Sequence, residues 1–257
     1  MSARTQIWSS GGGTQSCAIA AMIVLGELDK PDLAVIVDTE RECSTTWEYH
    51  DRYVAPALAS VGVTLYRVRK SDYATVDLYR GDDLLIPAFT DINGLTKGKG
   101  GKLPTFCSNE WKSRVVRRWA VAEHGVRKAA MWLGFSRDEE IRAWSAKENE
   151  SEKWRVRFPL LDARMRRHDC LMKVAAVGWP KPPRSRCWMC PNQSAREWAE
   201  VMDGPDALLA SSFERLIQER DAHIWLTERC KAVDCQDFSD PNLDLFGSEC
   251  GSGACFV

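Results

Sequence analysis

The chain has 257 residues and a formal net charge of −1, with 44% hydrophobic and 28% charged residues. This balance is typical of a globular protein with a sizeable core, and it gives no support to a generic polyanion binder. The N-terminus lacks the pattern of a secretory signal, and the longest apolar run, residues 17–25, is too short to span a bilayer. We therefore expect a cytoplasmic protein with no membrane partner.

A glycine-rich turn follows the first predicted strand, which ends at Gln6-Ile7-Trp8. The apolar run 17–25 after the turn is typical of a helix, and Gly26 ends it. Glycines let a ligand approach the backbone closely, and the amide groups of a helix N-terminus attract phosphate or sulfate. The turn is therefore a candidate anion site, although a tight surface turn with serine caps would show the same pattern. Its residues are Ser9, Ser10, Gly11, Gly12, Gly13, Thr14, Gln15 and Ser16.

The next elements predict a doubly wound, mostly parallel sheet. Residues 33–37 form a continuous apolar run, as in a strand that is buried on both faces. An apolar stripe over residues 47–61 indicates a helix that Pro56 kinks, and residues 64–68 form a third strand. Repeated strand–helix units imply right-handed crossovers between parallel strands.

Polar residues follow two of the predicted strands. Asp38 and Thr39 come directly after the second strand, at an edge where α/β proteins form ligand sites. Gly134 ends a fourth strand at 129–134, and Arg137 follows it. Lys112 lies near the start of a helical stripe over 111–122. Helix caps and a solvated charged face are the plain alternatives for these residues.

Cysteines are numerous, at ten, but a disulfide scaffold is not expected in a long, core-forming chain. Cys187 and Cys190 form a Cys-x-x-Cys pair, which can bind zinc, hold an iron–sulfur cluster or act as a redox dithiol. A metal site needs about four ligands. Cys107 lies upstream of the pair, and Cys170 is the candidate for the fourth, with Cys230, Cys235 and Cys255 in reserve.

The glycine turn resembles the pyrophosphate-binding loop of the ATP pyrophosphatase (PP-loop) superfamily, usually Ser-Gly-Gly-x-Asp-Ser. Here Gly11 stands for the leading serine and Gln15 for the aspartate, as in the sulfonucleotide (PAPS and APS) reductases. Glu40 stands where those enzymes usually have glycine. The resemblance implies an adenine nucleotide alpha hydrolase-like fold. It also implies that the nucleotide contacts the turn together with Asp38, Thr39, Lys112, Gly134 and Arg137.

The same resemblance implies a [4Fe-4S] cluster. Cluster-bearing members have a Cys-Cys pair, a gap of similar length and then Cys-x-x-Cys, whereas here Ser108 breaks the first pair. Many PP-loop proteins with such clusters use a cysteine at the position of Cys170. The implied ligands are Cys107, Cys170, Cys187 and Cys190, and an all-thiolate zinc site with the same spacing stays open.

The resemblance extends to function. Residues 1–200 would form a nucleotide-binding domain with the cluster, and residues 201–257 a helical, cysteine-bearing extension. Glu249-Cys250-Gly251 resembles the reductase tail, so Cys250 would attack the sulfur of PAPS or APS, and a thioredoxin-like donor would then free sulfite. Gln15 favours this reductase, whereas the broken Cys-Cys pair opposes it.

Two alternatives remain at this stage. One is an ATP-dependent iron–sulfur sulfur transferase that adenylylates a nucleic acid for thiolation. The other is an idle nucleotide-binding or redox-sensing protein.

Overall fold

The computed structural model describes residues 4–91 and 101–239. They form two compact units: unit 1 comprises residues 4–74 and 109–185, and unit 2 comprises 75–91, 101–108 and 186–239. Both units are therefore discontinuous in sequence, whereas the sequence suggested a single division at residue 200. No described helix is long and apolar enough to cross a membrane.

Unit 1 is built on a five-stranded sheet in which every neighbouring pair is parallel. The predicted parallel α/β fold is confirmed. Strand β1 is central, pairing with β2 on one side and β8 on the other. In spatial order the strands are β3 Leu65–Arg69, β2 Leu33–Asp38, β1 Thr5–Ser10, β8 Ala129–Trp132 and β9 Trp154–Arg157.

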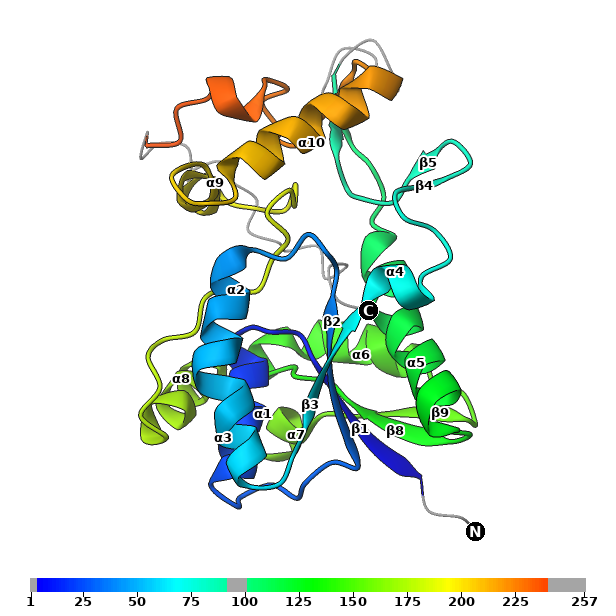
Figure 1. Cartoon of the computed structure of the whole chain (residues 1–257), viewed down its shortest axis with the longest axis vertical. Helices are drawn as coiled ribbons and strands as arrows, with labels where there is room; N and C mark the ends of the chain where they lie inside the picture. The colour runs from blue at the N-terminus through cyan, green and yellow to red at the C-terminus, as the bar shows by residue number, and fades with distance from the viewer. Residues whose placement is uncertain (1–3, 92–100, 240–257) are drawn as a thin grey trace. The chain divides into compact units, whose positions relative to one another are not determined.

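Helices cover both faces of this sheet, as in a doubly wound α/β fold (Figure 1). The alternation of a strand sends Ile7 and Trp8 of β1 to opposite cores. Helices α1 (Thr14–Val24), α3 (Ala55–Ser60) and α8 (Arg167–Ala176) pack on the Trp8 side, and α5 (Arg114–His124) packs on the Ile7 side.

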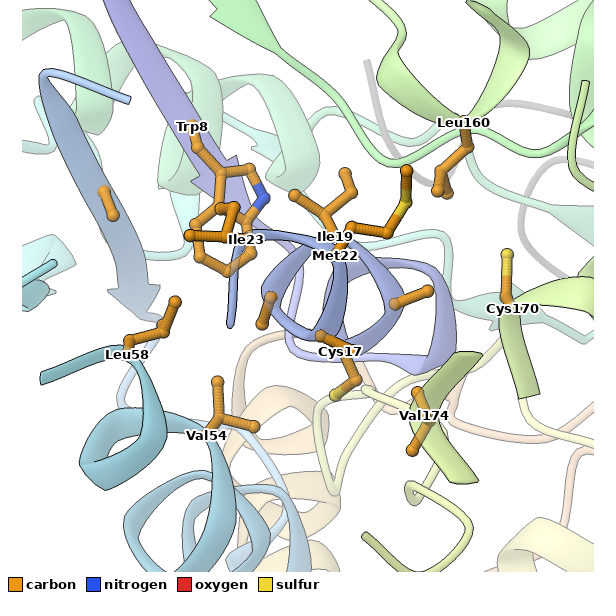
Figure 2. Close-up of a cluster of buried hydrophobic side chains, with 14 of the residues drawn as sticks. Trp8, Cys17, Ile19, Met22, Ile23, Val54, Leu58, Leu160, Cys170 and Val174 are labelled. Atoms are coloured by element: carbon orange, nitrogen blue, oxygen red, sulfur yellow. The ribbon is translucent and has the colours of Figure 1, made fainter. Parts of the chain in front are cut away.

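Helix α1 is the centre of the larger core (Figure 2). Its residues 17–21 are completely buried, so it has no solvent face along this stretch. Figure 2 shows Val54 and Leu58 on one side of α1, and Leu160, Cys170 and Val174 on the other. This helix therefore holds the glycine turn rigidly against the sheet.

The helix predicted over 47–61 is one continuous run with a local change of register. It comprises α2 Ser44–Tyr49, a π-helical turn His50–Val54 and α3. Pro56 lies in the first turn of α3 and has no amide hydrogen for a bond to the preceding turn. The π-helical turn changes the spacing of the backbone hydrogen bonds next to the proline and so accommodates the missing donor. It also changes the direction of the side chains just before the proline.

The remaining elements of unit 1 are short. They are α4 Lys70–Tyr73, a π-helical turn Asn109–Ser113, a 3-10 turn Arg137–Glu139, α6 Glu140–Glu148 and α7 Pro159–Asp162. Helix α6 packs Ala143 and Ala146 against Phe135 and Phe158.

Unit 2 has two helices and two small antiparallel sheets. Ser194 caps α9 in a capping box with Glu197. Buried Glu214 of α10 accepts the amides of Leu226 (2.9 Å) and Val233 (2.7 Å), and burial raises the pKa of its carboxyl. The helical elements of unit 2 are α9 Ala195–Met202, α10 Ala207–Arg220 and a 3-10 turn Val233–Cys235. One of its sheets is the hairpin of β4 Tyr79–Arg80 and β5 Asp83–Leu84, and the other contains, in spatial order, β10 Ile224–Trp225, β6 Phe89–Thr90 and β7 Gly101–Lys102.

Candidate functional site

The glycine turn lies at the carboxyl end of β1, where the strand order reverses. The chain leaves β1 for β2 and β3 on one side and returns to β8 on the other. In open parallel sheets, ligands bind outside the carboxyl ends of the strands at such a switch point. Strand β1 continues to Ser10, so Ser9 and Ser10 are its last residues and the turn proper is Gly11, Gly12 and Gly13.

Two glycines of the site pack closely on their neighbours, and the backbone of Gly12 is in the left-handed region that favours glycine. Gly12 has φ +80°, and a Cβ there would lie 3.1 Å from Thr46 Cγ2 and 3.2 Å from Ser185 Oγ. A Cβ on Gly134, just after β8, would lie 3.4 Å from the amide nitrogen of Ser16. The end of β8 therefore packs directly on the first turn of α1, and the nucleotide contact predicted for Gly134 stays a prediction.

Serine hydroxyls hold the turn in shape. Ser16 Oγ accepts the amide of Gly11 at 2.8 Å, and Ser10 Oγ accepts the amide of Gly12 at 3.3 Å. Gly13 is the N-cap of α1, so no side chain caps the helix, and its first turn has no acidic residue. The first amides of a helix have no carbonyl partner within it, so these amides can bind an anion.

A buried polar cluster supports the turn from behind. Ser185 Oγ donates to Glu42 Oε1 at 2.6 Å, and Lys112 Nζ lies 3.7 Å from Glu42 Oε2. The ring Nε2 of His50 lies 3.2 Å from the Gly12 carbonyl oxygen and donates to it. Burial lowers the pKa of His50 below its ordinary value of 6.5, so the ring is neutral near pH 7. Sequence reasoning found Lys112 but missed Glu42, His50 and Ser185.

The start of the α6 region completes the turn on the β8 side. Gln15 Nε2 donates to Glu139 Oε2 at 2.8 Å, and Glu139 also pairs with Arg142. Arg137 is about half-exposed and lies 3.5 Å from Glu140. The structure thus brings Gln15, Gly134 and residue Glu139 together around the first turn of α1.

Asp38 and Thr39 lie at the end of the neighbouring strand β2. Asp38 Oδ2 accepts from Arg67 at 2.7 Å, and Oδ1 accepts the amide of Glu40. Glu40 has φ 59°, a left-handed conformation that glycine adopts without cost and that other residues adopt less readily. Thr39 is completely buried, and Glu40 is held by Lys70 (3.4 Å).

An open hollow of about 790 Å³ lies beside edge strand β3, apart from the glycine turn. Asp38, Arg67, Tyr66, Trp119 and His124 are among its lining residues. The carboxylate of Asp38 therefore points towards this edge, and its predicted contact with a nucleotide remains a prediction.

The predicted cluster ligands do not form one group. Cys107, Cys187 and Cys190 belong to unit 2 and are half-buried, and the amide of Cys190 donates to the Cys187 carbonyl at 3.0 Å. Within the described part of the chain, no three His, Cys, Asp or Glu side chains lie close enough together to hold a metal ion. Cys250, the predicted nucleophile, and Cys255 lie outside the described residues.

Cys170 lies apart from the other predicted ligands in the chain's division into units. Its side chain is completely buried in the core of unit 1, next to α1 and Val174 (Figure 2). Burial raises the pKa of its thiol to about 12. The thiol packs as a small apolar side chain, and its role as a cluster ligand stays a prediction.

Comparison with known proteins gives little further information. No protein-family model matches the chain, and no curated protein matches it. Among solved structures, the U34-tRNA thiolase NcsA from Methanococcus maripaludis, with its [4Fe-4S] cluster, is similar at 16% sequence identity and a TM-score of 0.42. The match covers 84% of this chain and 72% of that chain. At this level of similarity we draw no argument from it.

Proposed function

We propose that this chain is a PP-loop enzyme that binds ATP at the glycine turn and activates a nucleic acid for sulfur transfer. The observation that carries the nucleotide site is the uncapped N-terminus of α1 at the β1/β8 switch point. There Gly12 adopts a left-handed conformation and Gly134 packs on Ser16. Such a turn offers several amide donors to phosphate oxygens at no cost in reorganisation.

Each residue of the site has a role in this proposal. The amides of residues 13–16 bind the β- and γ-phosphates, and Lys112 and Arg137 supply positive charge. Neutral His50 holds the Gly12 peptide through its carbonyl and so fixes the direction of the neighbouring amides. Glu42 and Ser185 hold Lys112 and the back of the turn in place.

The proposed reaction has two steps. A base carbonyl oxygen of the nucleic acid attacks the α-phosphorus of ATP, the bond from this phosphorus to the bridging oxygen breaks, and pyrophosphate leaves. A sulfur donor of the hydrosulfide class then adds to the activated carbon, and AMP leaves with the oxygen. No net oxidation occurs, so this reaction needs no thioredoxin-like donor.

Cys107, Cys187 and Cys190 have the chemistry of ligands to a thiolate-bound cluster or zinc ion, although among the described residues their side chains are not grouped closely enough to hold one. All three are sulfur donors, they are partly accessible, and a backbone hydrogen bond closes the turn between Cys187 and Cys190. A bound [4Fe-4S] cluster would supply a site for the incoming sulfur. These three cysteines are the part of the predicted ligand set that we retain.

Sulfonucleotide reduction is the second candidate, and Gln15 is the observation that favours it. A carboxamide replaces the aspartate of ATP-cleaving members, and it is held by Glu139 (2.8 Å) rather than directed at a metal ion. In that reaction, the Cys250 thiolate attacks the sulfur of PAPS or APS and the adenosine nucleotide leaves. A thioredoxin-like dithiol then releases sulfite and becomes a disulfide.

One experiment separates the two reactions. Anaerobically purified full-length protein is incubated with ATP and an RNA extract, and separately with APS or PAPS. Release of AMP and pyrophosphate that depends on RNA supports sulfur transfer. If the intact mass instead shows a sulfonate adduct that is absent from Cys250→Ser, sulfonucleotide reduction replaces sulfur transfer as the proposed function. If calorimetry detects no binding of ATP, APS or PAPS, both are excluded.

A further inference from the structure

Three exposed arginines lie around the start of α8, two of them in the segment that joins α7 to α8 and one as the first residue of α8. They are Arg164, Arg166 and Arg167, and none of them forms an ion pair within the described residues. Lone surface arginines are common, but three within four residues without a carboxylate partner concentrate positive charge. The net charge of the whole chain, −1, makes such a local concentration more informative.

The backbone of this segment is held firmly. The carboxylate of Asp169 accepts the amide of Arg166 at 2.7 Å, and that of Asp138 accepts the amide of Arg167 at 2.6 Å. Buried Met165 accepts the amide of Arg137 through its carbonyl at 2.9 Å. The carboxylates of Asp169 and Asp138 therefore bind backbone amides of this segment and form no ion pair with its guanidinium groups.

These contacts also place the arginines beside the glycine turn. Asp138 and Arg137, which hold the segment, are neighbours of Glu139, which binds Gln15 of the turn. All these residues belong to unit 1. A polyanion bound by the arginines would therefore lie next to a nucleotide at the turn.

Helix α6 adds an exposed aromatic side chain. Trp144 has 74% of its surface exposed, and Ile141, one turn earlier, has 83%. Tryptophan is strongly buried in most proteins, so this exposure is unusual. Helix α6 follows the 3-10 turn Arg137–Glu139, in which Asp138 accepts the amide of Arg167, so the helix that carries Trp144 begins beside the arginines.

We propose that Arg164, Arg166, Arg167 and Trp144 form a binding surface for single-stranded nucleic acid. The guanidinium groups bind successive phosphates, and the indole ring stacks on an unpaired base. This surface would hold the nucleic acid of the proposed function beside the activated nucleotide, so its role in catalysis rests on that function. An acidic protein segment has the charge but no base to stack on Trp144.

The test uses the full-length protein and a fluorescently labelled, mixed-sequence 20-mer, as single-stranded RNA and as DNA. Fluorescence anisotropy gives the Kd across a series of salt concentrations. The triple variant Arg164→Gln/Arg166→Gln/Arg167→Gln should bind about tenfold or more weakly. Its salt slope should fall by about 2, since each phosphate contact with a single strand contributes about 0.7. Trp144→Ala should weaken binding about fivefold or more, and Trp144→Phe should restore most of it.

A matched control variant removes three positive charges from the amino-terminal ends of the strands, at the end of the sheet opposite to the glycine turn. Lys30, Arg127 and Lys153 are exposed residues just before β2, β8 and β9. The variant Lys30→Gln/Arg127→Gln/Lys153→Gln should change the Kd less than twofold. The proposal is overturned if neither oligonucleotide binds, if both triple variants lose affinity equally, or if polyglutamate competes as well as RNA. Calorimetry with ATP is run in parallel, so that failure of the nucleotide site is seen separately from failure of this surface.

Discussion

Gly12→Ala is the change that tests the glycine turn most directly. Gly12 has φ +80°, where an alanine costs about 1–2 kcal/mol, partly offset by about 0.4–1 kcal/mol from a stiffer unfolded chain. Its new Cβ would also lie 3.1 Å from Thr46 Cγ2 and 3.2 Å from Ser185 Oγ. Crowding of this kind costs about 1–3 kcal/mol, so the total loss of unfolding free energy should be about 2–4 kcal/mol.

Gly62→Ala is the matched control. Gly62 has φ +78° but nothing within 4 Å of a Cβ, so only the backbone term of about 1 kcal/mol applies. Urea unfolding followed by tryptophan fluorescence measures both variants, and calorimetry measures their affinity for ATP. ATP should bind Gly12→Ala at least tenfold more weakly and Gly62→Ala as well as wild type. Equal stability losses, or an unchanged affinity in Gly12→Ala, would refute the reasoning.

Other predictions concern the groups behind the turn and the cysteines. The pKa of His50 is lower in the folded than in the unfolded chain, so the contribution of this ring to the free energy of unfolding is complete above about pH 6.5 and is lost as the pH falls below that value. His50→Gln should therefore flatten the pH dependence of the unfolding free energy in this range. Ser185→Ala leaves Glu42 without its 2.6 Å donor and should cost about 1–3 kcal/mol by urea unfolding, whereas Ser185→Thr should cost less if the hydroxyl matters. Cys170→Ala should keep the iron or zinc content of anaerobically purified protein, whereas Cys187→Ser should lose most of it; the reverse result by elemental analysis would restore Cys170 to the ligand set.

The sheet and the turn could be predicted from the sequence because their signals are local. An apolar run such as residues 33–37 specifies a buried strand by its own composition, and a glycine triplet before a helix specifies a turn. The confirmed parallel sheet follows from the repetition of such units.

The support behind the turn could not be predicted in the same way. Ser185 and Glu42 are 143 residues apart, and His50 is 38 residues from Gly12. No period or motif connects positions so distant, since only the folded sheet brings them together. Spacing along the chain also did not indicate that Cys170 lies on the inner face of α8, in the core of unit 1.

The order of the strands has a consequence for synthesis of the chain on the ribosome. The central strand β1 pairs with β8 in the register Thr5 to Ala129, so one side of β1 has no partner until β8 and β9 emerge late in synthesis. Contacts so distant in sequence form slowly, and the exposed edge of β1 must stay unpaired until then. Gly134 reaches Ser16 only after that pairing. Nascent chains that stop before β8 therefore lack the closed turn, and retention on immobilised ATP would select for chains whose synthesis has passed this point.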